Sequence, residues 1–153
     1  MNKKTIQKIK KTAADFSSTL STRQPKKLAD FLNITILERP YKKQLGAFAI
    51  VNKLPFIFLN ENLADEQKEY IIAHEIGHFL LHKKILKDVP MLRDFTLFSK
   101  RENEMEKEAN LFAASFMIDE KEFLSKIKEG YTQQELSLQY DIPESLIELL
   151  YNS

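Results

Sequence analysis

Two histidines and a glutamate stand together in the middle of the chain, in the run His74-Glu75-Ile76-Gly77-His78. On a helix, residues four apart lie on one face, so both imidazoles can reach one metal ion at ~2.0–2.1 Å. Glu75 then projects beside that face, where its carboxylate can take a proton from a water that the ion has made acidic. The spacing therefore predicts a hydrolytic metal site with His74 and His78 as ligands and Glu75 as general base.

The sequence around this run is apolar, which favours a metal site over a chance match. The flanking residues are Tyr70, Ile71, Ile72, Ala73, Ile76, Phe79, Leu80 and Leu81. We expect a buried helix over about residues 65–83, in which histidines without a metal, the alternative, would be costly. Gly77 costs that helix ~1 kcal/mol, and we expect it to let a neighbouring element approach the metal.

A catalytic zinc site needs a third protein ligand, and the composition restricts the choice. The chain has no Cys and three His. His82 continues the spacing, but along a straight helix it lies about 12 Å from His74, too far for both to reach one ion. We therefore expect a carboxylate as the third ligand.

The acidic segment 102–114 supplies that carboxylate. Its apolar residues recur at helical spacing and form an inward stripe of Met105, Ala109, Phe112, Ala113 and Phe116. Glu108 falls within this stripe, whereas Glu106 is expected to point away. Glu108 is the predicted ligand. Glu104, one turn earlier, is the alternative ligand or an acceptor for a ligating imidazole.

The segments 73–82 and 108–114 together resemble the ImmA/IrrE metallopeptidases, a likeness that covers roughly residues 25–117. The resemblance implies a zincin-like zinc endopeptidase, often encoded beside a helix-turn-helix repressor that it cleaves or inactivates. By position it implies His74, His78 and Glu108 as zinc ligands and Glu75 as catalytic base. Family members commonly end the second helix in a Leu-Leu-Met-Pro-like run. This chain has Phe116-Met117-Ile118-Asp119, which leaves the geometry of the helix exit open.

Length and composition restrict the number of domains and the class of protein. A chain of 153 residues with 43% hydrophobic content is long enough for one domain with a sizeable core. A net charge of +1 argues against wholesale nucleic-acid binding. The sequence shows no membrane span and no signal peptide, so we expect a cytoplasmic protein without membrane contact, with a monomer favoured. The absence of Cys excludes disulfides and thiol catalysis.

The predicted fold is α+β, with a small sheet of about three strands packed on the two site-bearing helices. We expect helices over 3–20 and 25–32 and a strand over 34–37. A hairpin of 46–51 and 55–59 should follow, with Gly46–Val51 either an edge strand that pairs with substrate or a core strand. The predicted units are an N-terminal amphipathic helix (1–24), a metallopeptidase core (25–119) and a C-terminal helical appendage (120–153).

The appendage resembles a helix-turn-helix, with Thr132 capping one helix and Pro143 opening the next. DNA-reading versions place Arg, Lys, Gln or Asn at the start of the second helix, whereas this chain has Glu144, Ser145 and Glu148. We therefore expect a structural cap or a docking surface for the repressor, with DNA binding as the rival function.

The predicted reaction is peptide-bond hydrolysis, with Zn²⁺ first and manganese or cobalt after it as the resident metal. A rival in another class is an anti-repressor that binds its partner without cutting it. The segment 84–100 is expected to be a flap, a substrate wall or a packed connector. The candidate donors to the oxyanion are His82, Tyr41, Arg93 and Tyr131.

Overall fold

The computed structural model describes the backbone of residues 1–86 and 100–153 and the side chains of residues 1–84 and 104–153. Most of the expected flap, including Arg93, therefore lies outside the described residues. The elements are α1 (Lys3–Leu20), α2 (Pro25–Phe31), β1 (Thr35–Arg39), β2 (Gly46–Val51), β3 (Leu54–Asn60), α3 (Asp65–Leu86), α4 (Lys100–Met117), α5 (Glu120–Lys128), α6 (Gln133–Tyr140) and α7 (Glu144–Tyr151).

The sheet has three strands in the order β1-β3-β2, which confirms the α+β prediction. β2 and β3 form the expected antiparallel hairpin, and β1 runs parallel to β3. The hairpin turn is made by Asn52 and Lys53, whose positive φ angles of 51° and 67° suit the twist of a tight two-residue connection. Among the described strands, Gly46–Val51 is thus an edge strand of the sheet.

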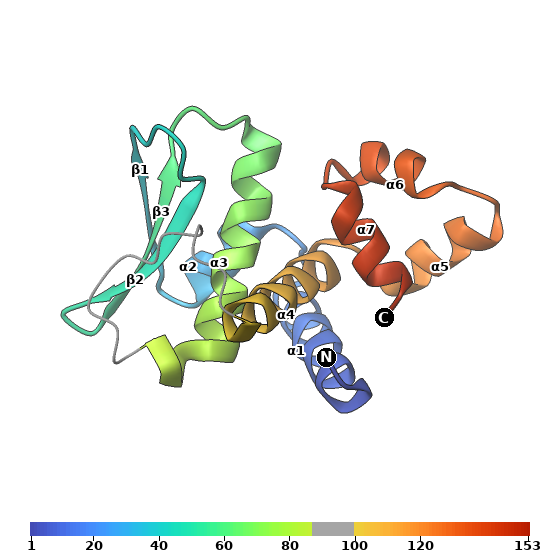
Figure 1. Ribbon diagram of the computed structural model, residues 1–153, viewed down its shortest axis with the longest axis horizontal. Coiled ribbons are helices and arrows are strands. Elements are labelled where there is room, and N and C mark those ends of the chain that lie inside the picture. The colour runs from blue at the N-terminus through green and yellow to red at the C-terminus, as the bar shows by residue number, and fades with distance from the viewer. Residues whose placement is uncertain (87–99) are drawn as a thin grey trace.

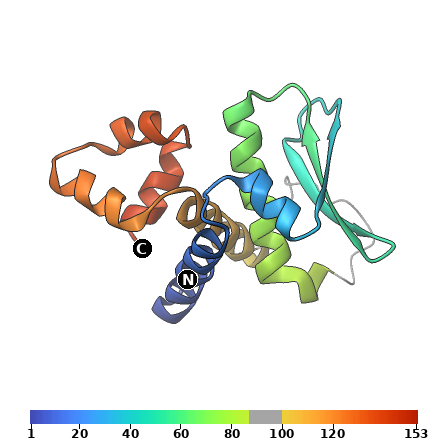
Figure 2. The same ribbon diagram turned by 180° about the vertical axis from the view of Figure 1, so that it is seen from behind.

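α3 runs between the sheet and α4 (Figure 1). α2 lies behind α3 in that view and in front of it when the molecule is seen from behind (Figure 2). The core around α3 contains side chains from the sheet, from α3 and from α4, among them Ile57, Ile72 and Phe112, each without exposed surface. A Cβ built on Gly77 would lie 3.0 Å from both the Cα and the carbonyl oxygen of Ala109. The expected close approach at Gly77 is therefore confirmed, and the element that approaches is α4.

Arg23, in the connection between α1 and α2, binds the C-terminal end of α4. Its Nη1 donates to the carbonyl oxygens of Ser115, Phe116 and Ile118 at 3.3, 3.0 and 3.0 Å. Its Nη2 lies 3.0 Å from Asp119, whose other oxygen accepts from the first turn of α5. An arginine thus satisfies the carbonyls that a helix end leaves without partners.

The C-terminal helices number three, since α5 precedes the expected pair α6 and α7. They share a buried cluster with the end of α4, made of Ala114, Ile118, Phe123, Leu136, Ile142, Leu146 and Ile147. α7 therefore buries Leu146 and Ile147 against the rest of the molecule. Among the described helices, none combines the length and the apolar character that crossing a bilayer demands.

The contact at Gly77 leads to a stability prediction. Gly77→Ala should lower the Tm of the metal-free protein, because the added methyl meets the backbone of Ala109 and must push α4 away. Overpacking of this kind costs about 1–3 kcal/mol, more than the ~1 kcal/mol that alanine contributes to helix propensity. Thermal unfolding followed by circular dichroism measures it, with Ser18→Ala at an exposed position of α1 as the control. A Tm for Gly77→Ala at or above that of the wild type would contradict the close packing of α3 and α4.

Candidate metal centre

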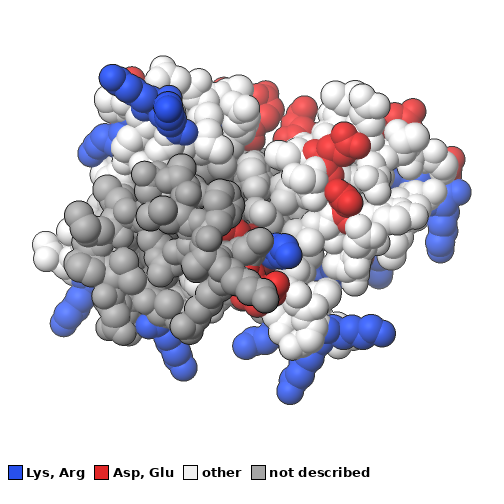
Figure 3. Space-filling view, in the orientation of Figure 1, with Lys and Arg blue, Asp and Glu red and all other residues white. Residues whose placement is uncertain are grey.

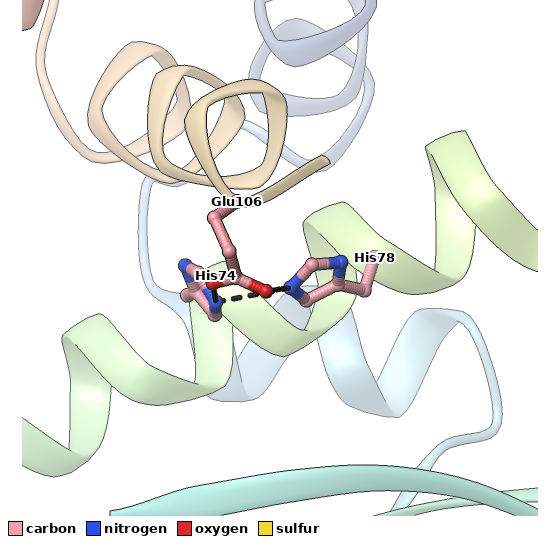
Figure 4. A group of neighbouring side chains, drawn as sticks. All are labelled: His74, His78 and Glu106. Carbon is pink, nitrogen blue, oxygen red and sulfur yellow. Dashed lines mark hydrogen bonds and ion pairs between the residues drawn. The ribbon is translucent and has the colours of Figure 1, made fainter. Parts of the chain in front are cut away.

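α3 presents two imidazoles to α4, and one carboxylate of α4 projects between them (Figure 4). Glu106 Oε2 lies 3.1 Å from His74 Nε2, and Glu106 Oε1 lies 3.1 Å from His78 Nε2. The two Nε2 atoms are themselves 3.1 Å apart. One ligand atom from each of these three residues lies within 4.8 Å of the others. The cluster therefore has the dimensions of a metal site.

Burial and the carboxylate set the charges in this cluster. Burial lowers the pKa of His78 to about 4, so its imidazole is neutral at neutral pH. Burial also lowers the pKa of His74, but hydrogen bonding to Glu106 and the charge of Glu75 outweigh it and leave that pKa raised. For Glu106, burial alone would raise the pKa, yet its bonds to both histidines lower it to about 2. Glu106 is therefore an ionised carboxylate, the form that binds metal.

His74 is oriented by an amide on α4. Its Nδ1 lies 2.7 Å from Asn110 Oδ1, and the hydroxyl of Tyr70 donates to the same oxygen at 2.8 Å. Burial raises the pKa of Tyr70, so that hydroxyl keeps its proton. Because an amide oxygen only accepts, the Nδ1 of His74 must donate, and its Nε2 faces Glu106.

His78 is oriented by a different chain of contacts. Its Nδ1 lies 3.1 Å from His82 Nδ1, and His82 Nε2 lies 2.9 Å from Glu108 Oε2. Glu108 therefore contacts His82, while Glu106 contacts the pair of histidines.

The donor set fits a divalent cation. Two imidazole nitrogens 3.1 Å apart and an ionised carboxylate meet in a region where both histidines are more than nine-tenths buried. When both Nε2 atoms are unprotonated, their lone pairs and the ionised carboxylate of Glu106 converge on one point and attract a cation. Two nitrogens and one oxygen are the ligands of many catalytic zinc sites, which keep a fourth position open.

Glu75, which stands between the two histidines in the sequence, has a buried carboxylate. Its side chain is 1% exposed, and within the described part of the chain no hydrogen-bond partner reaches its Oε1. Burial raises its pKa to about 7, with the charge of Glu106 adding to the shift and His74 opposing it. A general base is most effective when its pKa lies near the working pH, so Glu75 is suited to that task.

The orientation predicted for Glu106 was wrong, because its side chain points at both histidines. Glu108 as a metal ligand stays a prediction, and the geometry places it 2.9 Å from His82 instead. Glu104 is half-exposed and lies 3.2 Å from the amino group of Met1, away from the histidines.

The orientation of Glu106 was predicted wrongly because α4 is covered on several sides, by α1, α3 and α7. The apolar stripe of α4 therefore does not indicate which of these helices a given residue faces. Residues 111–114 are all fully buried, so helical periodicity in this stretch carries little directional information. The usable signal was Asn110, a polar residue inside an apolar run. Glu106 precedes it by four residues and so lies on the same face.

The described candidates for the oxyanion donor, His82, Tyr131 and Tyr41, lie in different parts of the fold. His82 has both ring nitrogens engaged, by His78 and by Glu108, which leaves it no donor for a substrate. Tyr131 lies in the connection between α5 and α6, and its ring centre is 5.5 Å from Lys126 Nζ. Tyr41 lies in the β1–β2 connection, where its carbonyl accepts from Asn60.

Comparison with known proteins identifies the family of this chain. The model of peptidase family M78, described as the IrrE N-terminal-like domain, matches residues 29–149. The chain belongs to this family. A Bacillus phage phi105 relative, "Uncharacterized immunity region protein 2", is 25% identical over 129 residues, covering 84% of this chain and 79% of the phage protein. "Metallopeptidase ImmA" of Bacillus subtilis strain 168 is 30% identical over 95 residues, covering 57% of this chain and 49% of ImmA.

Membership of this family confirms the resemblance read from the two sequence motifs. This chain is therefore a member of a peptidase family, and its own residues His74, His78 and Glu106 form a group that could hold a metal ion. The match to ImmA spans about half of that protein.

The raised pKa of Glu75 predicts a pH-dependent stability for the metal-free protein. The carboxyl ionises near 4.5 when unfolded and near 7 when folded, so between these values the folded state binds more protons. The contribution of Glu75 to the free energy of unfolding therefore falls as pH rises from 4.5 to 7. Glu75→Gln removes this loss and should be more stable than wild type by at most about 3 kcal/mol at pH 8 and by little at pH 4.5.

Urea unfolding in the presence of chelator, at pH 4.5 and pH 8, measures the difference. Glu104→Gln is the control, because its side chain is half-exposed and should give the same small effect at both pH values. A stability difference between Glu75→Gln and wild type that does not grow with pH would contradict the burial of an ionisable Glu75.

Proposed function

We propose that this chain is a zinc-dependent endopeptidase with His74, His78 and Glu106 as metal ligands and Glu75 as catalytic base. The proposal is carried by one observation: two imidazole Nε2 atoms and one ionised carboxylate meet beside the buried Glu75. One oxygen of Glu75 has no hydrogen-bond partner among the described residues. Membership of a peptidase family supports it.

A Zn²⁺ ion held by His74, His78 and Glu106 would supply Lewis acidity and would lower the pKa of a water molecule to about 7. The protein's own groups do the rest. Glu75, with a pKa of about 7, takes a proton from the attacking water and delivers it to the leaving amine. His74 and His78 stay oriented throughout because Asn110 and His82 hold their Nδ1 atoms. The surrounding apolar side chains exclude bulk water, which strengthens these electrostatic interactions.

The donor set also bears on the metal. Two imidazoles and one carboxylate suit zinc first, and manganese or cobalt after it. We propose zinc as the resident ion.

A peptide substrate would lie along β2, which forms the sheet edge next to α3. The ring of Phe48 on β2 packs on Phe79 of α3, one residue after His78, with ring centroids 5.3 Å apart. An extended peptide added at this edge would gain backbone hydrogen bonds and run past the face that carries the histidines. We propose a helix-turn-helix repressor in the cytoplasm as the protein substrate, supported by the immunity-region name of the phage relative.

The C-terminal helices give little support to a DNA-binding function. Residues 120–153 carry seven acidic and three basic side chains, and acidic groups mark their surface in Figure 3. α7, the helix that would enter a groove, begins with an exposed Glu144 and buries Leu146 and Ile147 against its neighbours. Acidic side chains repel phosphate, so we propose that these helices cap the peptidase unit.

If the chain is a zinc peptidase, loss of the base and loss of a metal ligand should have different effects. Glu75→Gln should bind one zinc ion per chain but cleave nothing, because the ligands remain and the base is lost. Glu106→Gln should lose stoichiometric zinc and activity together. Glu104→Gln, two residues earlier on the same helix and half-exposed, is the matched control and should retain both. The assay combines metal analysis of the dialysed proteins with incubation of each variant and the repressor encoded beside this chain's gene.

Chelator-sensitive fragments from the wild type support the enzyme. A stable complex with intact repressor would instead indicate an anti-repressor that acts by binding. Cleavage by Glu75→Gln at the wild-type rate would refute Glu75 as the base. Stoichiometric zinc in Glu106→Gln, together with its loss in Glu108→Gln, would restore Glu108 as the third ligand.

A further inference from the structure

The two histidines of the candidate metal centre are held from behind by different groups. His74 meets an amide oxygen, which can only accept a proton. His78 meets a second imidazole, His82, which can either donate or accept at the contacting nitrogen. The orientation of His78 therefore depends on which nitrogen of His82 carries the proton.

Glu108 settles this question. Its carboxylate lies 2.9 Å from His82 Nε2 and can only accept, so that nitrogen carries a hydrogen. In neutral His82 the other nitrogen, Nδ1, then has a lone pair and accepts from His78 Nδ1. With its hydrogen on Nδ1, His78 turns a lone pair on Nε2 toward Glu106, as a metal ligand must.

We propose that Glu108 and His82 are positioning residues, which act in series to fix the tautomer and orientation of His78 at the metal centre. The inference rests on the proposed metal site and adds to it a role for two residues that do not themselves touch the ion. It also explains why a titratable side chain such as His82, only 4% exposed, is placed on the buried side of α3.

The contact between His82 and Glu108 is a second connection between α3 and α4, beside the contact of Glu106 with His74 and His78. His78 and His82 stand one turn apart on α3, and Glu108 stands two residues beyond Glu106 on α4. One α4 carboxylate therefore contacts the Nε2 of His78 directly, and the other acts on its Nδ1 through an intervening ring. Groups that orient a ligating histidine in this way typically contribute about 10–100-fold to metal affinity.

Four variants test whether Glu108 acts on His78 through His82. Their affinity for Zn²⁺ is measured by competition with a chromophoric chelator. His82→Leu removes the acceptor at similar volume and should weaken zinc binding about 10–100-fold. His82→Asn places an amide oxygen near the position of Nδ1 and should recover most of that loss. Glu108→Leu should weaken binding in the wild-type background and have little further effect in the His82→Asn background, where nothing reaches Glu108 from residue 82.

Visible absorption of the Co²⁺-substituted proteins provides a second readout that a merely structural role would not move. His82→Leu and Glu108→Leu should broaden or shift the ligand-field bands, and His82→Asn should keep the wild-type spectrum. Equal zinc affinity and an unchanged cobalt spectrum in His82→Leu would overturn the proposal. A loss from Glu108→Leu that persists in the His82→Asn background would overturn it too, because Glu108 would then bind the ion directly.

Failure of the proposed function gives a different pattern. In that case the wild type itself binds no stoichiometric metal, or Glu106→Gln binds it as well as the wild type does. If only His82→Leu proves unfolded, His82→Asn and Glu108→Leu still decide the matter, because neither introduces an apolar side chain at position 82.

Discussion

The close approach of α3 and α4 at Gly77 and Ala109 is the constraint on which the site depends. A Cβ on Gly77 would come within 3.0 Å of the backbone of α4, so the two helices can touch only because that side chain is absent. This contact brings Glu106 to within 3.1 Å of both histidines. Helix propensity is given up at the centre of α3, and a carboxylate from another helix gains access to its face.

Other parts of the fold hold α4 against α3. α1 packs along α4, and Arg23 binds three carbonyl groups at its exit and the side chain of Asp119. Helix ends with satisfied carbonyls fray less, so the position of Glu106 along α4 is better defined. The C-terminal helices bury the last turn of α4 in a cluster of their own. The sheet covers the opposite side of α3, and β2 is an edge strand among the described strands.

Around the ligands, nearly every polar group has a defined partner. Asn110 and Tyr70 hold His74, while His82 and Glu108 lie behind His78. Buried polar groups of this kind are costly unless they are satisfied, and a satisfied network fixes its members in one arrangement. Within the described residues Glu75 departs from this pattern, with one oxygen buried and without a partner. Such a group is poised to bind a proton, which suits a base in hydrolysis.

Local patterns predicted most of the fold. The hairpin follows from alternating apolar runs around Asn52 and Lys53, and α3 follows from an apolar stretch that contains His74 and His78. The third carboxylate could not be placed in the same way, because α4 is buried on several sides and its burial pattern does not identify the face that meets α3. That face depends on tertiary packing, which the spacing of apolar residues in α4 does not encode. α5 was missed for a related reason, since a helix of 9 residues gives a short periodic signal.

Anomalous diffraction at the zinc edge, from crystals of the zinc-loaded protein, can locate the metal and its ligands. We expect one strong peak, about 2.0–2.2 Å from His74 Nε2, from His78 Nε2 and from a carboxylate oxygen of Glu106, with Glu108 on His82 and outside the coordination sphere. A peak coordinated by Glu108, or no peak between the two histidines at stoichiometric zinc, would contradict it.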